Sequence, residues 1–147
     1  MALGGYAVVS SERSRESPER MIRTAASIHH WAMTRAKLIL KGPREKTDLE
    51  LLVDTGSLYT WISGSILKKV GVSPTSHRKF TTIEGRILER PIGDALIEYK
   101  GDSAHCVVVF AQEDDVNVMG MTALENLGLE VDPTRETLKR VESLAAF

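Results

Sequence analysis

The stretch Leu51-Leu52-Val53-Asp54-Thr55-Gly56-Ser57 carries the information on which the prediction of the fold depends. An apolar run typical of a strand ends directly at a carboxylate, a hydroxyl residue and a glycine. Glycine lets the backbone turn sharply, and Asp and Thr side chains in such a turn form local hydrogen bonds that orient the carboxylate. We therefore expect a strand that delivers Asp54 into a tight loop.

A single carboxylate held in this way has limited chemistry of its own. Two carboxylates about 3 Å apart share one proton, because like charges at that separation cannot both ionise, and such a pair activates a water molecule. The chain of 147 residues contains one Asp-Thr-Gly motif. The second carboxylate would therefore come from a second copy of the chain. Asp-Thr-Gly is also an ordinary turn between strands, so a non-catalytic turn is the alternative.

Together with three further features in the expected order, the motif resembles the retroviral-type (retropepsin-like) aspartic proteases, and most closely their cellular and archaeal single-domain members. The resemblance extends from about residue 36 to about residue 132. The first of these features is a flap with a glycine near its tip, at residues 79–86. The second is the strand and turn that follow the flap, at residues 95–101. The third is an apolar stretch with a glycine ahead of a short C-terminal helix, at residues 116–120.

The resemblance implies a mainly β, closed-barrel-type domain with two short helices, which forms one lobe of an aspartic protease. This domain would occupy residues 35–142, after an N-terminal extension at residues 1–34 that is partly disordered or helical. The implied activity is endopeptidase hydrolysis by a homodimer, through a water activated by two Asp54 residues, one per chain. The implied partners are a peptide or protein substrate and the second copy, and no cofactor or metal is implied.

The residues of the active-site loop have distinct implied roles. In the family, the threonine at the position of Thr55 reaches across to the opposite loop, and the glycine at Gly56 offers its carbonyl to the substrate. From its position, the Ser57 hydroxyl is expected to donate a hydrogen bond to the Asp54 carboxylate. Such a bond would lower the apparent pKa values of the carboxylate pair and move the activity optimum toward acid.

Two further groups of residues are expected to contact the substrate. A flap would close over the peptide and exclude water, and its residues are Ile83, Glu84, Gly85 and Arg86. Side-chain pockets would be lined by Trp61, Val116 and Val118, each of which is equally interpretable as an ordinary core residue.

Three positions depart from the viral pattern. Many viral members pair an arginine with an acid where this chain has Met121 and Leu58, so we expect an apolar contact to replace that ion pair. The flap has one glycine, Gly85, where viral flaps have several. A second hypothesis is a retropepsin-like binding or dimerisation module with weak or no peptidase activity; the intact Asp54-Thr55-Gly56 argues against such a loss, and the altered flap does not. A third is an unrelated β-barrel in which Asp54 is a turn residue.

Strands are predicted elsewhere by β-branched, aromatic and alternating runs bounded by turn signals. A short helix is predicted over residues 66–70, with an N-cap from residues 63–65 and an end at Gly71. The predicted strands cover residues 38–40, 58–62, 80–82, 87–88, 95–99, 106–110, 129–131 and 137–141.

Two more helices follow from capping signals and helical spacing. One covers residues 123–127, where Thr122 and Glu125 have the spacing of a capping box. The other covers residues 17–32 and carries His29-His30, which we interpret as a solvated or packed pair because no further ligand has metal-site spacing.

Composition places the chain among globular proteins, with 42% hydrophobic and 27% charged residues. The net charge of −1 and the lack of a basic cluster argue against a nucleic-acid partner. The single cysteine, Cys106, is expected in the core, and three amide side chains in the whole chain favour a thermophilic source. No apolar run is long enough for a membrane span, and no secretory signal is recognisable, so we expect a cytoplasmic protein without membrane contact.

Overall fold

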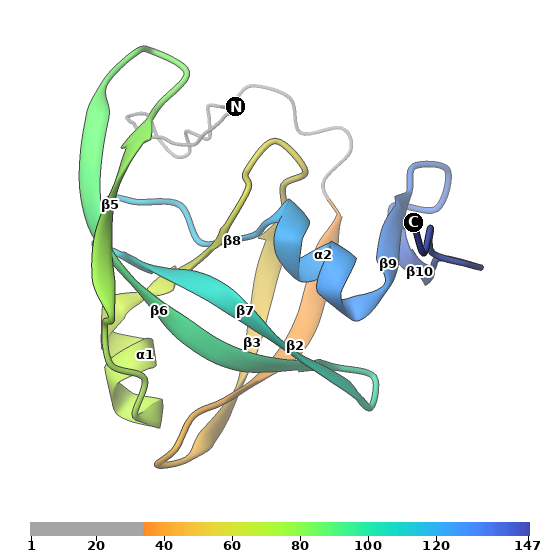
Figure 1. Cartoon of the computed structure of the whole chain (residues 1–147), viewed down its shortest axis with the longest axis horizontal. Coiled ribbons are helices and arrows are strands. Elements are labelled where there is room, and N and C mark those ends of the chain that lie inside the picture. The colour runs from red at the N-terminus through yellow and green to blue at the C-terminus, as the bar shows by residue number, and fades with distance from the viewer. Residues whose placement is uncertain (1–33) are drawn as a thin grey trace.

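The computed structural model describes residues 34–147 as a mainly β domain with two short helices (Figure 1). This confirms the expected class of fold. The predicted helix over residues 17–32, with His29-His30, lies outside the described residues, as does the N-terminal extension up to residue 33. Neither described helix, at seven residues each, is long or apolar enough to cross a bilayer.

The strands form one large sheet and one separate hairpin. The large sheet has seven strands in the order β2-β3-β8-β4-β7-β6-β5, and β9 pairs with β10 alone. In chain order the elements are β2 (Arg35–Lys41), β3 (Lys46–Val53), β4 (Thr60–Ser63), α1 (Gly64–Val70), β5 (Ser76–Thr81), β6 (Ile87–Tyr99), β7 (Asp102–Ala111), β8 (Val118–Met119), α2 (Met121–Leu127), β9 (Leu129–Asp132) and β10 (Thr137–Arg140).

The long strand β6 connects two regions of the sheet. Its first half pairs with β5, from Ile87 opposite Thr81 to Ile92 opposite Ser76. Its second half pairs with β7, and residues 96–98 also pair with β2. Among the described residues β5 has β6 as its one neighbour, so the sheet has an open edge there. The pairing of β2 with β6 joins the first strand of the sheet to its sixth, but β5 stays outside with an open edge, so the expected closed barrel does not include all seven strands.

The prediction of two separate strands at residues 87–88 and 95–99 is also wrong, because β6 runs unbroken through Pro91. Pro91 lies opposite His77, one residue before the pairing with β7 begins. Within residues 34–147, β6 has at Pro91 a neighbouring strand on one side only. A residue without an N–H group is tolerated there because the other side of the strand is unpaired. The continuous strand makes a stiff arm that extends the β5–β6 hairpin away from the core (Figure 1).

The strand β8 determines where the two ends of the Asp54 loop lie. That loop joins β3 to β4, yet β8 lies between these two strands in the sheet. Val118 pairs with Leu52 of β3 in parallel and with Trp61 of β4 in antiparallel orientation. The loop must therefore arch over the end of β8, and its conformation depends on a segment about 60 residues further along the chain.

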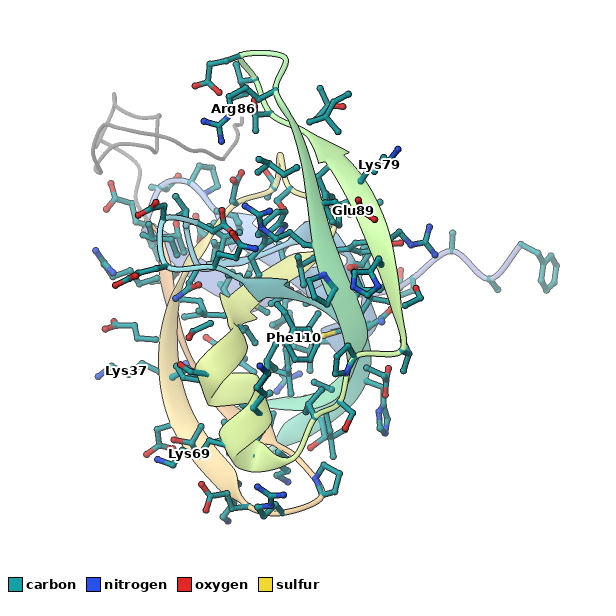
Figure 2. The ribbon with its side chains drawn as sticks, turned by 90° about the vertical axis from the view of Figure 1, so that its left-hand side faces the viewer. Lys37, Lys69, Lys79, Arg86, Glu89 and Phe110 are labelled. Carbon is teal, nitrogen blue, oxygen red and sulfur yellow. The ribbon has the colours of Figure 1, made fainter. Side chains whose placement is uncertain are left out.

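The main hydrophobic core follows from strand alternation. In β2, Ala36, Leu38 and Leu40 are buried, whereas the residues between them face outward. The helix α1 adds Leu67 and Val70, and Figure 2 shows the ring of Phe110, which also belongs to the core, in the interior. Burial of each large aliphatic side chain contributes about 1.5–3 kcal/mol, which makes this core the main source of stability.

The cysteine prediction is confirmed, since Cys106 on β7 is buried in this core. Burial, and to a smaller extent the nearby Asp94 carboxylate, raises the pKa of the Cys106 thiol to about 12. The thiol is therefore protonated at neutral pH and is a packing residue without nucleophilic character.

The helix α1 starts at Gly64, two residues before the predicted start. Ser63 occupies the N-cap position but makes no side-chain cap bond, and its hydroxyl instead lies 2.9 Å from that of Ser65. The predicted end is confirmed: Gly71 has φ of 96°, a conformation that glycine adopts without steric cost.

Candidate functional site

The Asp54 loop is a tight turn whose own backbone orients the carboxylate. The Asp54 N–H donates to the Met119 carbonyl at 2.9 Å, which attaches the residue to β8. The Gly56 N–H donates to Asp54 Oδ1 at 2.9 Å, and the Ser57 N–H donates to the Asp54 carbonyl at 3.1 Å. A bond from an N–H to a carboxylate is charge-assisted and short. The predicted strand, turn and oriented carboxylate are confirmed, and Asp54 is half-buried.

The expected bond from Ser57 to the carboxylate is wrong. The Ser57 hydroxyl donates to the Tyr59 carbonyl at 2.8 Å. A hydroxyl carries one proton, so it cannot donate to Asp54 at the same time. The Gly56 N–H takes the role that sequence reasoning gave to Ser57. Thr55 and Gly56 are exposed on the surface of the single chain.

The loop also holds the start of α2, where the first N–H groups of a helix have no partner within the helix. The Met121 N–H donates to the Ser57 carbonyl at 2.8 Å, and the Thr122 N–H donates to the Leu58 carbonyl at 3.0 Å. The Thr122 hydroxyl donates to that same carbonyl at 2.8 Å. The predicted capping box is therefore wrong: Gly120 is the N-cap residue, and backbone carbonyls of the loop replace a capping side chain.

Gly120 lies where the loop, β8 and α2 meet. Its N–H donates to the hydroxyl of the fully buried Thr60 at 3.0 Å. A Cβ atom at Gly120 would stand 2.2 Å from the Tyr59 carbonyl oxygen and 2.9 Å from that of Ser57. The backbone φ of −92° is ordinary, so close approach is the reason for glycine here. Sequence reasoning identified this glycine from the family pattern, but its contacts come from the fold.

The predicted flap is the turn of the β5–β6 hairpin. The Thr82 N–H donates to the Arg86 carbonyl at 2.8 Å, and the Arg86 N–H donates back to the Thr82 hydroxyl at 3.0 Å. Gly85 adopts φ of 90° at the tip, which explains why glycine stands there. Residues 83–86 are exposed.

The hairpin and the Asp54 loop lie at the same end of the molecule. In Figure 1 both are at the top, opposite α1, and Figure 2 shows Arg86 at the tip of the hairpin with Lys79 and Glu89 further down its strands. Lys79 and Glu89 are register partners. The structure thus places the predicted flap residues on one projecting element, at the end that also carries Asp54.

An apolar row crosses the sheet on the face opposite the main core. Strand pairing aligns Val118 with Trp61, Trp61 with Val109, and Val109 with Ile92. Residues paired in this way point to the same face of a sheet. The predicted pocket residues Trp61 and Val118 are therefore neighbours in this row, which sequence spacing could not reveal.

The three predicted pocket residues differ in how exposed they are in the single chain. Val118 is buried in the single chain and belongs to the packed sheet. Trp61 and Val116 are partly exposed and are the better candidates for contact with a ligand.

Phe80, which sequence reasoning did not assign to the site, packs the β5–β6 hairpin against Trp61 and Tyr59. Its ring meets the Trp61 ring at 5.0 Å between centroids, and the Tyr59 ring at 6.2 Å, both edge to face. Such pairs contribute about 0.5–1.5 kcal/mol beyond area burial. Phe80 pairs with Leu88, one pair from the turn, so the end of the hairpin next to its turn is packed against the segment that follows Asp54.

Apolar surface is concentrated around the Asp54 loop and the flap. Leu58 and Met121 lie on segments joined by hydrogen bonds, and both side chains are exposed. Ile83 and Ile87 of the hairpin are exposed as well. Exposed apolar groups gathered around one feature are typical of a surface that another molecule covers.

No cluster of three or more metal-ligating side chains occurs within residues 34–147. The nearest arrangement is an exposed pair, in which His105 Nδ1 lies 2.7 Å from Asp94 Oδ2. Two ligands at the surface are fewer than a structural or catalytic metal site requires.

Comparison with known proteins gives limited similarity. No protein-family model matches the chain. Two curated relatives match over 82 residues: transcription elongation factor SPT5 of Eremothecium gossypii, at 29% identity, and that of Candida glabrata, at 30%. Each match covers 56% of this chain and 8% of the relative. The chain thus spans a small part of the length of these relatives, and their role is not transferred to it.

Replacing Gly120 with Ala should destabilise the fold, because the new Cβ atom would collide with two carbonyl oxygens of the Asp54 loop. We expect the free energy of unfolding in urea to fall by about 1–3 kcal/mol, the usual cost of overpacking. Gly64→Ala is the matched control, since the nearest atom there is 3.5 Å away. Equal stability of the two variants would contradict the close approach described above.

Proposed function

We propose that this chain has the retropepsin fold and forms one half of a homodimeric aspartic endopeptidase. The observation that carries the proposal is the conformation of the Asp54 loop. A strand delivers the carboxylate, the Gly56 N–H orients it at 2.9 Å, and the Met119 carbonyl holds its backbone at 2.9 Å. This arrangement suits a carboxylate that must keep one direction while its proton is exchanged.

In the proposed reaction, the two Asp54 carboxylates of a dimer flank one water molecule. The ionised carboxylate removes a proton from the water as general base, and the protonated one donates a proton to the scissile amide as general acid. The exposed Thr55 would contact the loop of the partner. Gly56, whose N–H is already engaged by Asp54, would offer its carbonyl to the substrate. No cofactor takes part in this chemistry.

The flap supports a peptide as the substrate. An extended peptide lying between the hairpin and the Asp54 loop would add a strand to the site and place its side chains alternately toward the two walls. Trp61 and Val116 would contact those side chains from the floor, and Ile83 would contact them from the flap. Closure of the hairpin would exclude water from the scissile bond. The expected location remains the cytoplasm.

The proposed dimer also accounts for the exposed apolar residues. Leu58 and Met121 flank the Asp54 loop, which must face its counterpart closely if two carboxylates are to share a proton. Exposed aliphatic side chains at that place would be buried by the second copy. Each would then contribute to association in proportion to the apolar area that is still exposed in the single chain, which is larger for Leu58 than for Met121.

A second candidate is a dimeric binding module of the same fold that captures peptides without cleaving them. The buried Val118 favours it, because one of the three expected pocket residues is unavailable to a ligand in the single chain. The flap tip with its single glycine also favours it. The SPT5 relatives contribute no argument here, since the match covers 8% of their length and leaves the role of Asp54 open.

Substitution of Asp54 by Asn tests the proposed catalysis. The change removes the ionisable group at nearly constant volume, so we expect peptide hydrolysis to be abolished while circular dichroism and sedimentation stay unchanged. Asp48→Asn, at an exposed position of the strand that leads to Asp54, is the matched control and should retain full activity. Hydrolysis at the wild-type rate by the Asp54 variant would overturn the aspartic mechanism. Peptide binding without hydrolysis by the wild-type protein would favour the binding module.

Dilution tests the shared active site. Because each chain supplies one carboxylate, activity per chain should fall once the protein concentration drops below the dimer dissociation constant. Well below that constant the total rate should change with the square of protein concentration, and the activity per chain should follow the dimer fraction measured by sedimentation. An active monomer over the whole concentration range would contradict the proposal.

Replacing Ser57 with Ala should leave the pH profile of hydrolysis unchanged. The Ser57 hydroxyl donates to the Tyr59 carbonyl, so its removal leaves the donor to the carboxylate, the Gly56 N–H, in place. We expect a loss of about 1 kcal/mol in stability from the missing hydrogen bond. A shift of the activity optimum toward higher pH would show instead that the hydroxyl acts on the carboxylate pair.

A further inference from the structure

A buried ion pair lies between the flap hairpin and the segment that leads to β8. Arg90 Nε donates to Asp115 Oδ2 at 2.7 Å, and Arg90 Nη2 donates to Asp115 Oδ1 at 3.0 Å. The Arg90 and Asp115 side chains are 11% and 9% exposed. Two parallel hydrogen bonds fix both the distance and the orientation of the two planar groups.

The same carboxylate shapes its own loop. Asp115 Oδ2 accepts a hydrogen bond from the Gln112 N–H at 2.7 Å, and the Asp115 N–H donates to the Gln112 carbonyl at 2.9 Å. The turn after β7 is thus closed by Asp115 and attached to β6 by Arg90. Val116 follows immediately, so the position of this partly exposed residue relative to the hairpin depends on the ion pair.

The ion pair differs from the other charge pairs of the described residues. Lys139 and Glu130, for example, lie 3.7 Å apart with side chains that are 54% and 50% exposed. A buried ion pair gives little stability compared with an apolar pair of similar size, because both charges lose their hydration. What the ion pair provides is a defined geometry, which here joins the hairpin to the segment that carries Val116.

We propose that Arg90 and Asp115 are positioning residues that hold Val116 at a fixed distance from the flap hairpin and thereby determine which substrate side chains the site accepts. This inference rests on the proposed peptidase activity. Phe80, on the other strand of the hairpin, packs on Trp61 and gives the hairpin a second attachment close to its turn. Neither Arg90 nor Asp115 contacts the reacting atoms.

The test uses Asp115→Asn, which keeps the shape of the side chain and an acceptor for the Gln112 N–H, and Arg90→Lys, which keeps the charge but loses the two parallel bonds. Glu130→Gln is the matched control at an exposed pair. The readout is the ratio of kcat/KM for two peptides that differ in one side chain, leucine against phenylalanine, next to the scissile bond. We expect this ratio to move toward unity by about fivefold or more in both variants and not in the control.

A purely structural ion pair would give a different result. It would lower the thermal midpoint of both variants and leave the selectivity ratio at the wild-type value, which would overturn the proposal. In the double variant we expect no further loss of selectivity beyond the single changes, because the two residues act through one contact. Additive losses would contradict that coupling.

Amide hydrogen exchange supplies a readout that does not require activity. In Asp115→Asn, amides of residues 82–88 and of residues 112–118 should both exchange faster than in the wild-type protein. Faster exchange confined to residues 112–118 would overturn the coupling to the flap. If the wild-type protein hydrolyses no peptide, the peptidase and the selectivity role both fail, while exchange still decides whether the ion pair couples the two segments.

Discussion

The close approach of Gly120 to the Asp54 loop is the constraint on which the rest of the site depends. The Tyr59 and Ser57 carbonyl oxygens lie so near Gly120 that a side chain there would collide with both. That proximity lets the loop accept the first N–H groups of α2 and lets Gly120 donate to the buried Thr60 hydroxyl. The loop, the helix and β8 therefore form one hydrogen-bonded unit, and the direction of the Asp54 carboxylate is set by that unit.

This unit explains how a stable domain presents polar groups at one end. The apolar core in which Leu40 and Leu67 are buried lies on the other side of the sheet and supplies most of the stability. The turn at Thr55 and Gly56 can therefore be exposed, and the hairpin can project from the domain, while the core remains packed.

The flap hairpin is attached to this unit by two contacts of different kinds. Phe80 packs on Trp61 through an aromatic edge, and Arg90 holds Asp115 through two charge-assisted hydrogen bonds. The aromatic contact tolerates small rotations, whereas the paired hydrogen bonds do not. The hairpin is thus held close to its turn by Phe80 and further along β6 by Arg90.

The sequence by itself determined the mainly β class, the turn at Asp54, the hairpin tip at Gly85 and the end of α1 at Gly71. These features depend on neighbouring residues, through alternation and backbone conformation, so local pattern was sufficient. The position of β8 between β3 and β4, the alignment of Trp61 with Val118, and the Arg90–Asp115 pair were decided only by the tertiary structure. Each joins residues far apart in the chain, and no local signal records such a pairing. Ser57 shows the same limit in a single residue: its position indicated a bond to Asp54, but the arch of the loop over β8 brings the Tyr59 carbonyl within reach of the hydroxyl instead.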